Sequence, residues 1–194
     1  MRALGLVFTI FVMLFSVACE KKEEFHGTLY DKPAKEFCLT GWKDGKEKKV
    51  CLSDFKGKVV LLFFGYTHCP DVCPAALQVL AKTMNLIPEE KREKVQVIFI
   101  SVDPERDTPE KAQKYTEYFY PTFIGVTGSP EEIKKVAKDY MAFYKKVESE
   151  SKTGYLVDHT AYIYLIDPEG NLKLLYPSTR QKPELMAEDI EKFL

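Results

Sequence analysis

Three predominantly apolar runs predict the core strands of the fold. They span Val59–Phe64, Val95–Val102 and Ala161–Ile166, and all are rich in β-branched and aromatic residues. Gly57 and Gly65 bound the first run. Short runs without polar interruption are typical of strands that are buried on both faces. We therefore expect these three segments at the centre of a sheet.

Polar segments with helical signals separate these runs. Thr108-Pro109 places an N-cap residue before a proline at the first helical position. Ser129–Glu132 has the capping-box pattern, and a last helix is expected from about Pro183 to the C-terminus. Strands that alternate with helices predict an α/β fold, with a central, mostly parallel sheet flanked by helices.

A β-hairpin is predicted at Phe37–Leu52, because Asp44-Gly45 is a strong two-residue turn signal. The register around this turn places Cys38 opposite Cys51 in a non-hydrogen-bonded pair, the class that brings side chains closest. A structural disulfide fits that geometry. A register slip that leaves two independent thiols is the alternative.

The first residues have the character of an export signal. From Ala3 to Ala18 the chain is apolar and uncharged, and only Arg2 before it is basic. The run is short for a bilayer-spanning helix, which needs roughly 20 residues. Small residues, Ser16-Val17-Ala18, precede Cys19, which resembles a bacterial lipoprotein signal with Cys19 as the lipidated residue. Ser16 stands where such signals usually carry leucine.

An uncleaved anchor and an ordinary cleaved signal are alternative interpretations, and all three export the domain. The predicted organisation is an export signal or membrane anchor at 1–18, a polar tether at 19–30 and one globular domain at 31–194. We expect a protein tethered to the bacterial cytoplasmic membrane that faces the periplasm or extracytoplasmic space. Cysteines exported there meet an oxidising compartment.

Composition narrows the class of protein. The chain has 194 residues, 45% of them hydrophobic, which suits a single domain with a full core. The formal net charge of −1 gives no electrostatic reason to expect a nucleic-acid partner.

Candidate chemistry begins directly after the first predicted strand, with Cys69 and Cys73. Their position places both thiols at the carboxyl edge of the sheet, where open α/β sheets bind ligands. Pro74 predicts that the next helix starts close to it. Thiols at a helix N-terminus are stabilised as thiolates. Asp71, between them, opposes that ionisation unless a cation compensates.

Spacing and a third side chain distinguish the possible chemistries. The two cysteines have three residues between them, whereas disulfide oxidoreductases of the thioredoxin type have two. His159 lies just before the third predicted strand, and from its position alone it is either a structural histidine or a ligand. Two thiolates and one imidazole form a soft, low-coordinate set that suits Cu(I), whereas zinc ordinarily takes a fourth ligand.

Four separated motifs together resemble the Sco/SenC family over about residues 30 to 194. They are Lys58–Pro74, Ser101–Pro109, Val126–Pro130 and Val157–Ala161. The resemblance implies a thioredoxin-like fold with an added N-terminal hairpin. It also implies a membrane-anchored copper chaperone for cytochrome c oxidase assembly.

The family pattern maps its thiol ligands onto Cys69 and Cys73 and its distal ligand onto His159. The implied cargo is Cu(I), with Cu(II) as a further state, and the implied partner is the oxidase subunit that accepts it in a dinuclear copper site. The same thiols could reduce that subunit's cysteines. Cys38 and Cys51 are outside the family's metal motif.

Residues near the expected site receive smaller roles. Asp71 and Asp158 are expected around the metal, with Asp158 orienting His159 or screening the metal. Turn and cap chemistry accounts for Asp103 and Asp107. His68 is assigned to packing, and His26 to the tether.

A charged loop at Lys145–Thr153 precedes His159. We expect this loop to be mobile and to become ordered when copper draws the imidazole toward the thiolates.

A thiol–disulfide oxidoreductase or thiol peroxidase is the alternative function. Against a peroxidase, Tyr66 stands where peroxiredoxins carry threonine or serine. Against a general oxidoreductase stand the wider cysteine spacing and the absence of a proline directly before Ala161.

Overall fold

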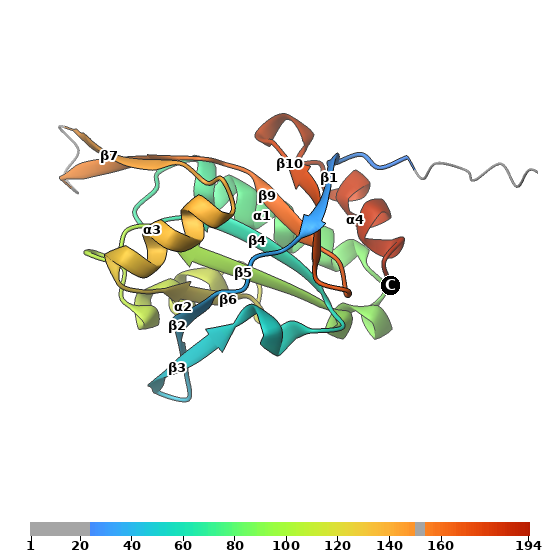
Figure 1. Ribbon diagram of the computed structural model, residues 1–194, viewed down its shortest axis with the longest axis horizontal. Coiled ribbons are helices and arrows are strands. Elements are labelled where there is room, and N and C mark those ends of the chain that lie inside the picture. The colour runs from blue at the N-terminus through green and yellow to red at the C-terminus, as the bar shows by residue number, and fades with distance from the viewer. Residues whose placement is uncertain (1–23, 150–153) are drawn as a thin grey trace, which may run out of the picture.

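The computed structural model describes residues 24–149 and 154–194. One sheet of eight strands, with helices on both faces, forms the body (Figure 1). The predicted export signal at 1–18 and Cys19 lie outside the described residues. Within the described ranges, no helix has both the length and the apolar character needed to cross a bilayer.

The order of the central strands and of most helices along the chain agrees with the sequence prediction. The strands are β1 Thr28–Pro33, β2 Cys38–Lys43, β3 Lys46–Cys51, β4 Val59–Gly65, β5 Val95–Ser101, β6 Ile124–Thr127, β7 Tyr144–Glu148, β8 Tyr155–His159, β9 Ile163–Ile166 and β10 Asn171–Tyr176. The α-helices are α1 Val72–Leu86, α2 Pro109–Glu117, α3 Pro130–Asp139 and α4 Pro183–Glu191. Short 3₁₀ segments lie at Leu52–Phe55, Glu89–Lys94 and Ser178–Arg180.

The sheet has the strand order β1-β10-β9-β4-β5-β6-β2-β3. Strands β4, β5 and β6 run parallel at its centre, whereas β9, the third predicted core strand, is antiparallel to β4. The outer pairings are antiparallel, so the sheet as a whole is mixed. The reason is local for two of these pairings: β2–β3 and β9–β10 are hairpins, and a short turn joins antiparallel strands only.

Helices cover the sheet unequally. In Figure 1, α3 lies in front of the sheet, and α1 and α2 lie behind it. Helix α4 packs against α1, and α2 packs against β6, β2 and β5. Strand β4 is buried along its whole length, which explains why its sequence is apolar without alternation.

Aromatic side chains from β4 reach both layers. Phe64 packs against Tyr140, at the end of α3, and against Tyr164 on β9. Phe63 points to the other face, toward Phe99 on β5. Burying each such ring contributes about 1.5–3 kcal/mol to stability. The carboxyl end of β4, where the chemistry begins, is therefore held rigidly from both sides.

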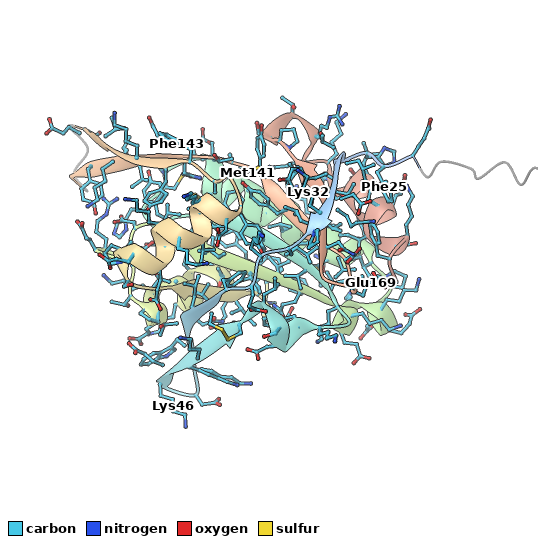
Figure 2. The ribbon with its side chains drawn as sticks, in the orientation of Figure 1. Phe25, Lys32, Lys46, Met141, Phe143 and Glu169 are labelled. Atoms are coloured by element: carbon cyan, nitrogen blue, oxygen red, sulfur yellow. A yellow bond between two sulfur atoms is a disulfide. The ribbon has the colours of Figure 1, made fainter. Side chains whose placement is uncertain are left out.

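The predicted hairpin is β2–β3. Asp44 and Gly45 at its tip have φ angles of 53° and 76°, the left-handed conformation that a two-residue hairpin turn of this kind requires. The register pairs Cys38 with Cys51, as the turn position predicts. Their sulfur atoms are bonded at 2.05 Å, a link visible as a yellow bond in Figure 2.

Removing this disulfide is expected to destabilise the domain without affecting the chemistry of the free cysteines, Cys69 and Cys73. The bond closes a short loop, since its cysteines are 13 positions apart. A loop of that size corresponds to about 3 kcal/mol in the free energy of unfolding. Urea unfolding of the double variant Cys38→Ser/Cys51→Ser measures the loss. An unfolding free energy equal to that of the wild type would contradict a stabilising role.

The folded domain begins before residue 31, where the sequence placed its boundary. Strand β1 starts at Thr28 and pairs with β10. Just before it, the buried carboxylate of Asp189 on α4 accepts hydrogen bonds from the backbone N–H groups of His26 and Gly27. The ring of Phe25 stacks on Phe193. These contacts attach this segment to α4, although its polar sequence had suggested that it belongs to the tether.

Much of the charged segment before His159 is a strand rather than the predicted loop. Tyr144–Glu148 forms β7 and pairs with β8 in a two-stranded ribbon, which extends from the body in Figure 1. Residues 150–153 lie outside the described part of the chain. The charges misled the prediction because the ribbon exposes them to solvent, as a strand outside the main sheet can.

Candidate metal centre

The two free cysteines of the described residues lie where β4 passes into α1. A turn after β4 brings the backbone N–H of Cys69 to the carbonyl of Tyr66 at 3.2 Å. Helix α1 begins at Val72, two residues before the predicted start at Pro74. Pro74 is compatible with this position, because N–H groups of the first helical turn have no intrahelical partner. Cys73 therefore belongs to the helix and Cys69 to the turn before it.

His159 is the last residue of β8 and reaches the thiols from across the sheet edge. Its ring meets Phe63 and Tyr66 edge-on, with centroids 6.0 and 5.8 Å apart. Its Nδ1 lies 3.3 Å from the carbonyl oxygen of Thr160. A protonated Nδ1 that donates to this carbonyl leaves Nε2 available to bind a metal.

The three predicted ligands converge. Nε2 of His159 lies 3.2 Å from Sγ of Cys73 and 4.0 Å from Sγ of Cys69. All three atoms lie within 4.8 Å of one another. Side chains that bind one transition-metal ion at about 2.0–2.3 Å lie at comparable mutual distances. The donor set and its spacing therefore fit a single soft ion.

Gly65, the last residue of β4, makes room for this arrangement. A Cβ atom at that position would lie 2.7 Å from Sγ of Cys73 and 2.8 Å from the ring of Phe99. No side chain fits there without displacing the thiol. The strand ends in glycine because α1 brings Cys73 directly against its backbone.

The two thiols differ in exposure and in acidity. A hydrogen bond from Cys73 lowers the pKa of Cys69 to about 4, and His159 and nearby backbone amides act in the same direction. Burial raises the pKa of Cys73 well above its usual range, and the adjacent Cys69 adds to that effect. Without metal, the centre therefore holds one thiolate and one thiol. A metal bound by both sulfurs displaces the proton of Cys73.

Alkylation of the reduced, metal-free protein is expected to report this asymmetry. Cys69 should react with iodoacetamide at nearly the same rate at pH 6 and pH 8, because it is already a thiolate. An ordinary thiol, with a pKa near 8.5, slows about tenfold per pH unit over that range. Mass spectrometry identifies the modified cysteine, and the urea-unfolded chain is the control. A tenfold loss of the Cys69 rate per unit in the folded protein would contradict the lowered pKa.

Other residues that the sequence placed near the site lie outside it. Asp71 and Asp158 are exposed, and the described contacts include none between their carboxylates and the sulfurs or imidazole. Asp158 pairs in register with Lys145 on the outer face of the ribbon. The orienting contact expected from Asp158 is made by the Thr160 carbonyl. Nδ1 of His68 lies 3.1 Å from the Thr67 hydroxyl and 3.5 Å from a carboxylate oxygen of Asp107.

The segment after β5 has a role at the site that the sequence did not predict. The Asp107 side chain is fully buried and contacts Thr67, two residues before Cys69. Thr108, rather than Asp107, caps α2 by accepting a hydrogen bond from the backbone of Lys111. Two aspartates and an arginine within five residues were the available signal. A polar cluster directly after a buried strand favours a role at the sheet edge.

Comparison with known proteins places this arrangement in one family. The SCO1/SenC family model matches residues 32–194. The mitochondrial SCO1 homolog 1 of Arabidopsis thaliana is 47% identical over 129 residues, which are 66% of this chain and 38% of that protein. The chain spans about half the length or less of several such relatives, including 54% of the bovine mitochondrial SCO2 homolog.

Solved structures agree with the fold. The solution structure of apo Sco1 from Thermus thermophilus is 43% identical, with a TM-score of 0.77, and the match covers 90% of this chain and 99% of that one. The copper-bound structure of ScoI from Arabidopsis thaliana is 40% identical, with a TM-score of 0.73, and the match covers 82% and 96% of the two chains. The similarity therefore extends through the whole described domain.

Proposed function

The chain belongs to the SCO1/SenC family, and from that premise we propose that it binds copper through Cys69, Cys73 and His159 and delivers it during cytochrome c oxidase assembly. The observation that carries the proposal is the convergence of two sulfurs and one imidazole nitrogen within 4.8 Å. Thiolate and imidazole together favour copper, and a three-ligand set suits Cu(I). The copper-bound relative with the same fold supports this choice of metal.

Graded exposure of the ligands suits a protein that releases its metal. Cys73 is fully buried, Cys69 is 9% exposed and His159 is half-buried. An acceptor protein can approach the histidine and Cys69 first, so ligand exchange would begin there and end at Cys73. The metal is cargo in this scheme, passed to the copper-accepting subunit of the oxidase.

Membrane attachment is part of the proposal. The apolar segment at 3–18, followed by Cys19, supports an exported and tethered protein. Phe25 already packs on Phe193 of the folded domain, so only a few residues separate that domain from Cys19. Tethering on the extracytoplasmic side would confine the chaperone near a membrane-bound oxidase. Mass spectrometry of the membrane-extracted N-terminus tests for acylation of Cys19.

Copper titration of the reduced full-length protein tests the function. We expect one copper ion per chain and transfer of that ion to a separately purified copper-accepting oxidase domain. Failure to retain copper, together with catalytic reduction of disulfide substrates, would contradict the chaperone function and favour the oxidoreductase.

Thiol reduction is a second activity supported by a specific observation. Cys69 has its pKa lowered to about 4 and lies beside a second free thiol. Such a pair can attack a partner disulfide and then resolve the mixed disulfide through Cys73. In that step the acceptor's disulfide is reduced to two thiols and Cys69–Cys73 becomes a disulfide. The same protein could therefore reduce an acceptor's cysteines before it metallates them.

A further inference from the structure

We propose that the loop between β5 and α2, residues Ser101–Thr108, positions both halves of the metal centre: Asp107 fixes the approach to Cys69, and Asp103 with Arg106 fixes the strand that carries His159. We call these residues the bracket loop. The inference rests on the proposed copper function, and it assigns roles to side chains that do not contact the metal site themselves.

The cysteine half is held by Asp107. One carboxylate oxygen accepts the backbone N–H of Thr67 at 2.8 Å and the hydroxyl of Ser101 at 2.5 Å. The other oxygen accepts the Thr67 hydroxyl at 2.5 Å. A buried carboxylate with three donors has one favourable placement, because breaking any of these bonds leaves a buried polar group without a partner. The backbone two residues before Cys69 is thus fixed to the end of β5.

The histidine half is held by Asp103 and Arg106. Asp103 accepts the hydroxyl of Tyr155 at 2.6 Å and Nε of Arg106 at 2.5 Å. Nη1 of Arg106 donates to the backbone carbonyl of Tyr155 at 2.8 Å, and the guanidinium lies 3.6 Å from the centroid of the Tyr155 ring. Tyr155 opens β8, and His159 closes it.

These contacts matter because the ribbon of β7 and β8 is not hydrogen-bonded into the main sheet. The position of β8 therefore depends on its short link to β9 and on side-chain contacts with the body. A charge-assisted hydrogen bond to its backbone and a stacked guanidinium are among the stronger contacts of this kind. An ion pair of Lys146 with Glu105, in the bracket loop, adds a second link from β7.

The two halves meet in one tight turn. The backbone N–H groups of Arg106 and Asp107 both donate to the carbonyl of Asp103, at 3.1 and 2.9 Å. The group that holds the cysteine approach and the groups that hold the histidine strand are therefore rigidly connected. This connection explains how sulfur and nitrogen converge, and such preorganisation increases affinity by reducing the cost of ordering.

Conservative variants of the full-length protein test the bracket loop. Asp107→Asn and Tyr155→Phe are each expected to lower Cu(I) affinity about 10- to 100-fold, the range seen when groups that orient metal ligands are removed. The two variants should differ in the spectra of the Cu(II) form. Asp107→Asn is expected to shift the thiolate-to-copper charge-transfer band, whereas Tyr155→Phe is expected to change the nitrogen hyperfine coupling from the imidazole.

The matched control is Asp167→Asn. Asp167 is also a buried carboxylate in a turn, and it accepts the backbone N–H of Asn171 at 2.7 Å. It follows β9 at the amino-terminal end of β4, because Ile166 pairs with Val60. This variant should lose stability but keep the copper affinity and both spectra of the wild type.

Two further measurements keep the inference testable. Thr67→Val removes one hydrogen bond to Asp107 and keeps the backbone bond, so it serves if Asp107→Asn does not fold. In the metal-free protein, Asp107→Asn, Tyr155→Phe and Thr67→Val should each speed alkylation of Cys69 and shift the ¹⁵N resonance of the His159 imidazole. A wild-type protein that binds no copper would refute the proposed function. The alkylation rate and the imidazole resonance would still test the bracket loop, because neither measurement needs copper. Variants with wild-type copper affinity, spectra, alkylation rate and imidazole shift would overturn the bracket loop.

Discussion

Cys73→Ser is expected to lower the affinity for Cu(I) by at least about a thousandfold, or about 4 kcal/mol. The variant replaces a buried sulfur, which would bind copper as a thiolate, by a hard hydroxyl, and soft metals select thiolate ligands. The loss should exceed the roughly 10- to 100-fold caused by removing groups behind a ligand, because Cys73 contacts the metal itself. Competition with a Cu(I) chelator of known affinity measures the change.

The control for that variant is the double change Cys38→Ser/Cys51→Ser. It removes two sulfurs from the β2–β3 hairpin, whose cysteines are bonded to each other in the structure. Its Cu(I) affinity should equal that of the wild type, although its unfolding free energy falls. Equal affinity in Cys73→Ser and the wild type would mean that copper binds elsewhere.

His159→Ala is expected to weaken copper binding by about a hundredfold or more while both thiols remain intact. The imidazole approaches the sulfurs at 3.2 and 4.0 Å, so its removal leaves a two-sulfur site with an open side. The Cu(II) form should suffer more than the Cu(I) form, because imidazole suits Cu(II) and two thiolates alone do not stabilise it. Titration in each oxidation state measures the two losses.

His26→Ala is the matched control for the histidine. His26 contacts Glu188 on α4 at 2.9 Å and has no described contact with the sulfurs. Its removal should leave copper binding unchanged. If His159→Ala reduces disulfide substrates normally but keeps full copper affinity, the histidine is not a ligand and the assignment fails.

The central strands and the cysteine loop could be predicted from sequence because local signals agree with the fold there. Val59–Phe64 is apolar on both faces, and Asp44-Gly45 fixes the hairpin register by its turn chemistry alone. The place of Cys69 and Cys73 follows from their position after a buried strand. Such features depend on neighbours in sequence.

The remaining features depend on contacts that sequence spacing does not encode. The ribbon of β7 and β8 is stabilised by Arg106, which is 49 positions from Tyr155. Because the sequence does not show this contact, the charged residues of the ribbon suggested a loop. The role of Asp107 depends on a hydrogen bond across 40 positions to Thr67. The assignment of His159 as a ligand came from family resemblance, since its position alone favoured a structural histidine. Its packing against Phe63 and Tyr66 becomes visible only in three dimensions.

X-ray absorption spectroscopy of the Cu(I)-loaded full-length protein tests the central claim most directly. With Cys69, Cys73 and His159 as ligands, we expect two sulfur scatterers and one imidazole nitrogen around each copper. The nitrogen contribution should be lost in His159→Ala. A wild-type spectrum fitted by sulfur alone, or by nitrogen and oxygen without sulfur, would contradict it.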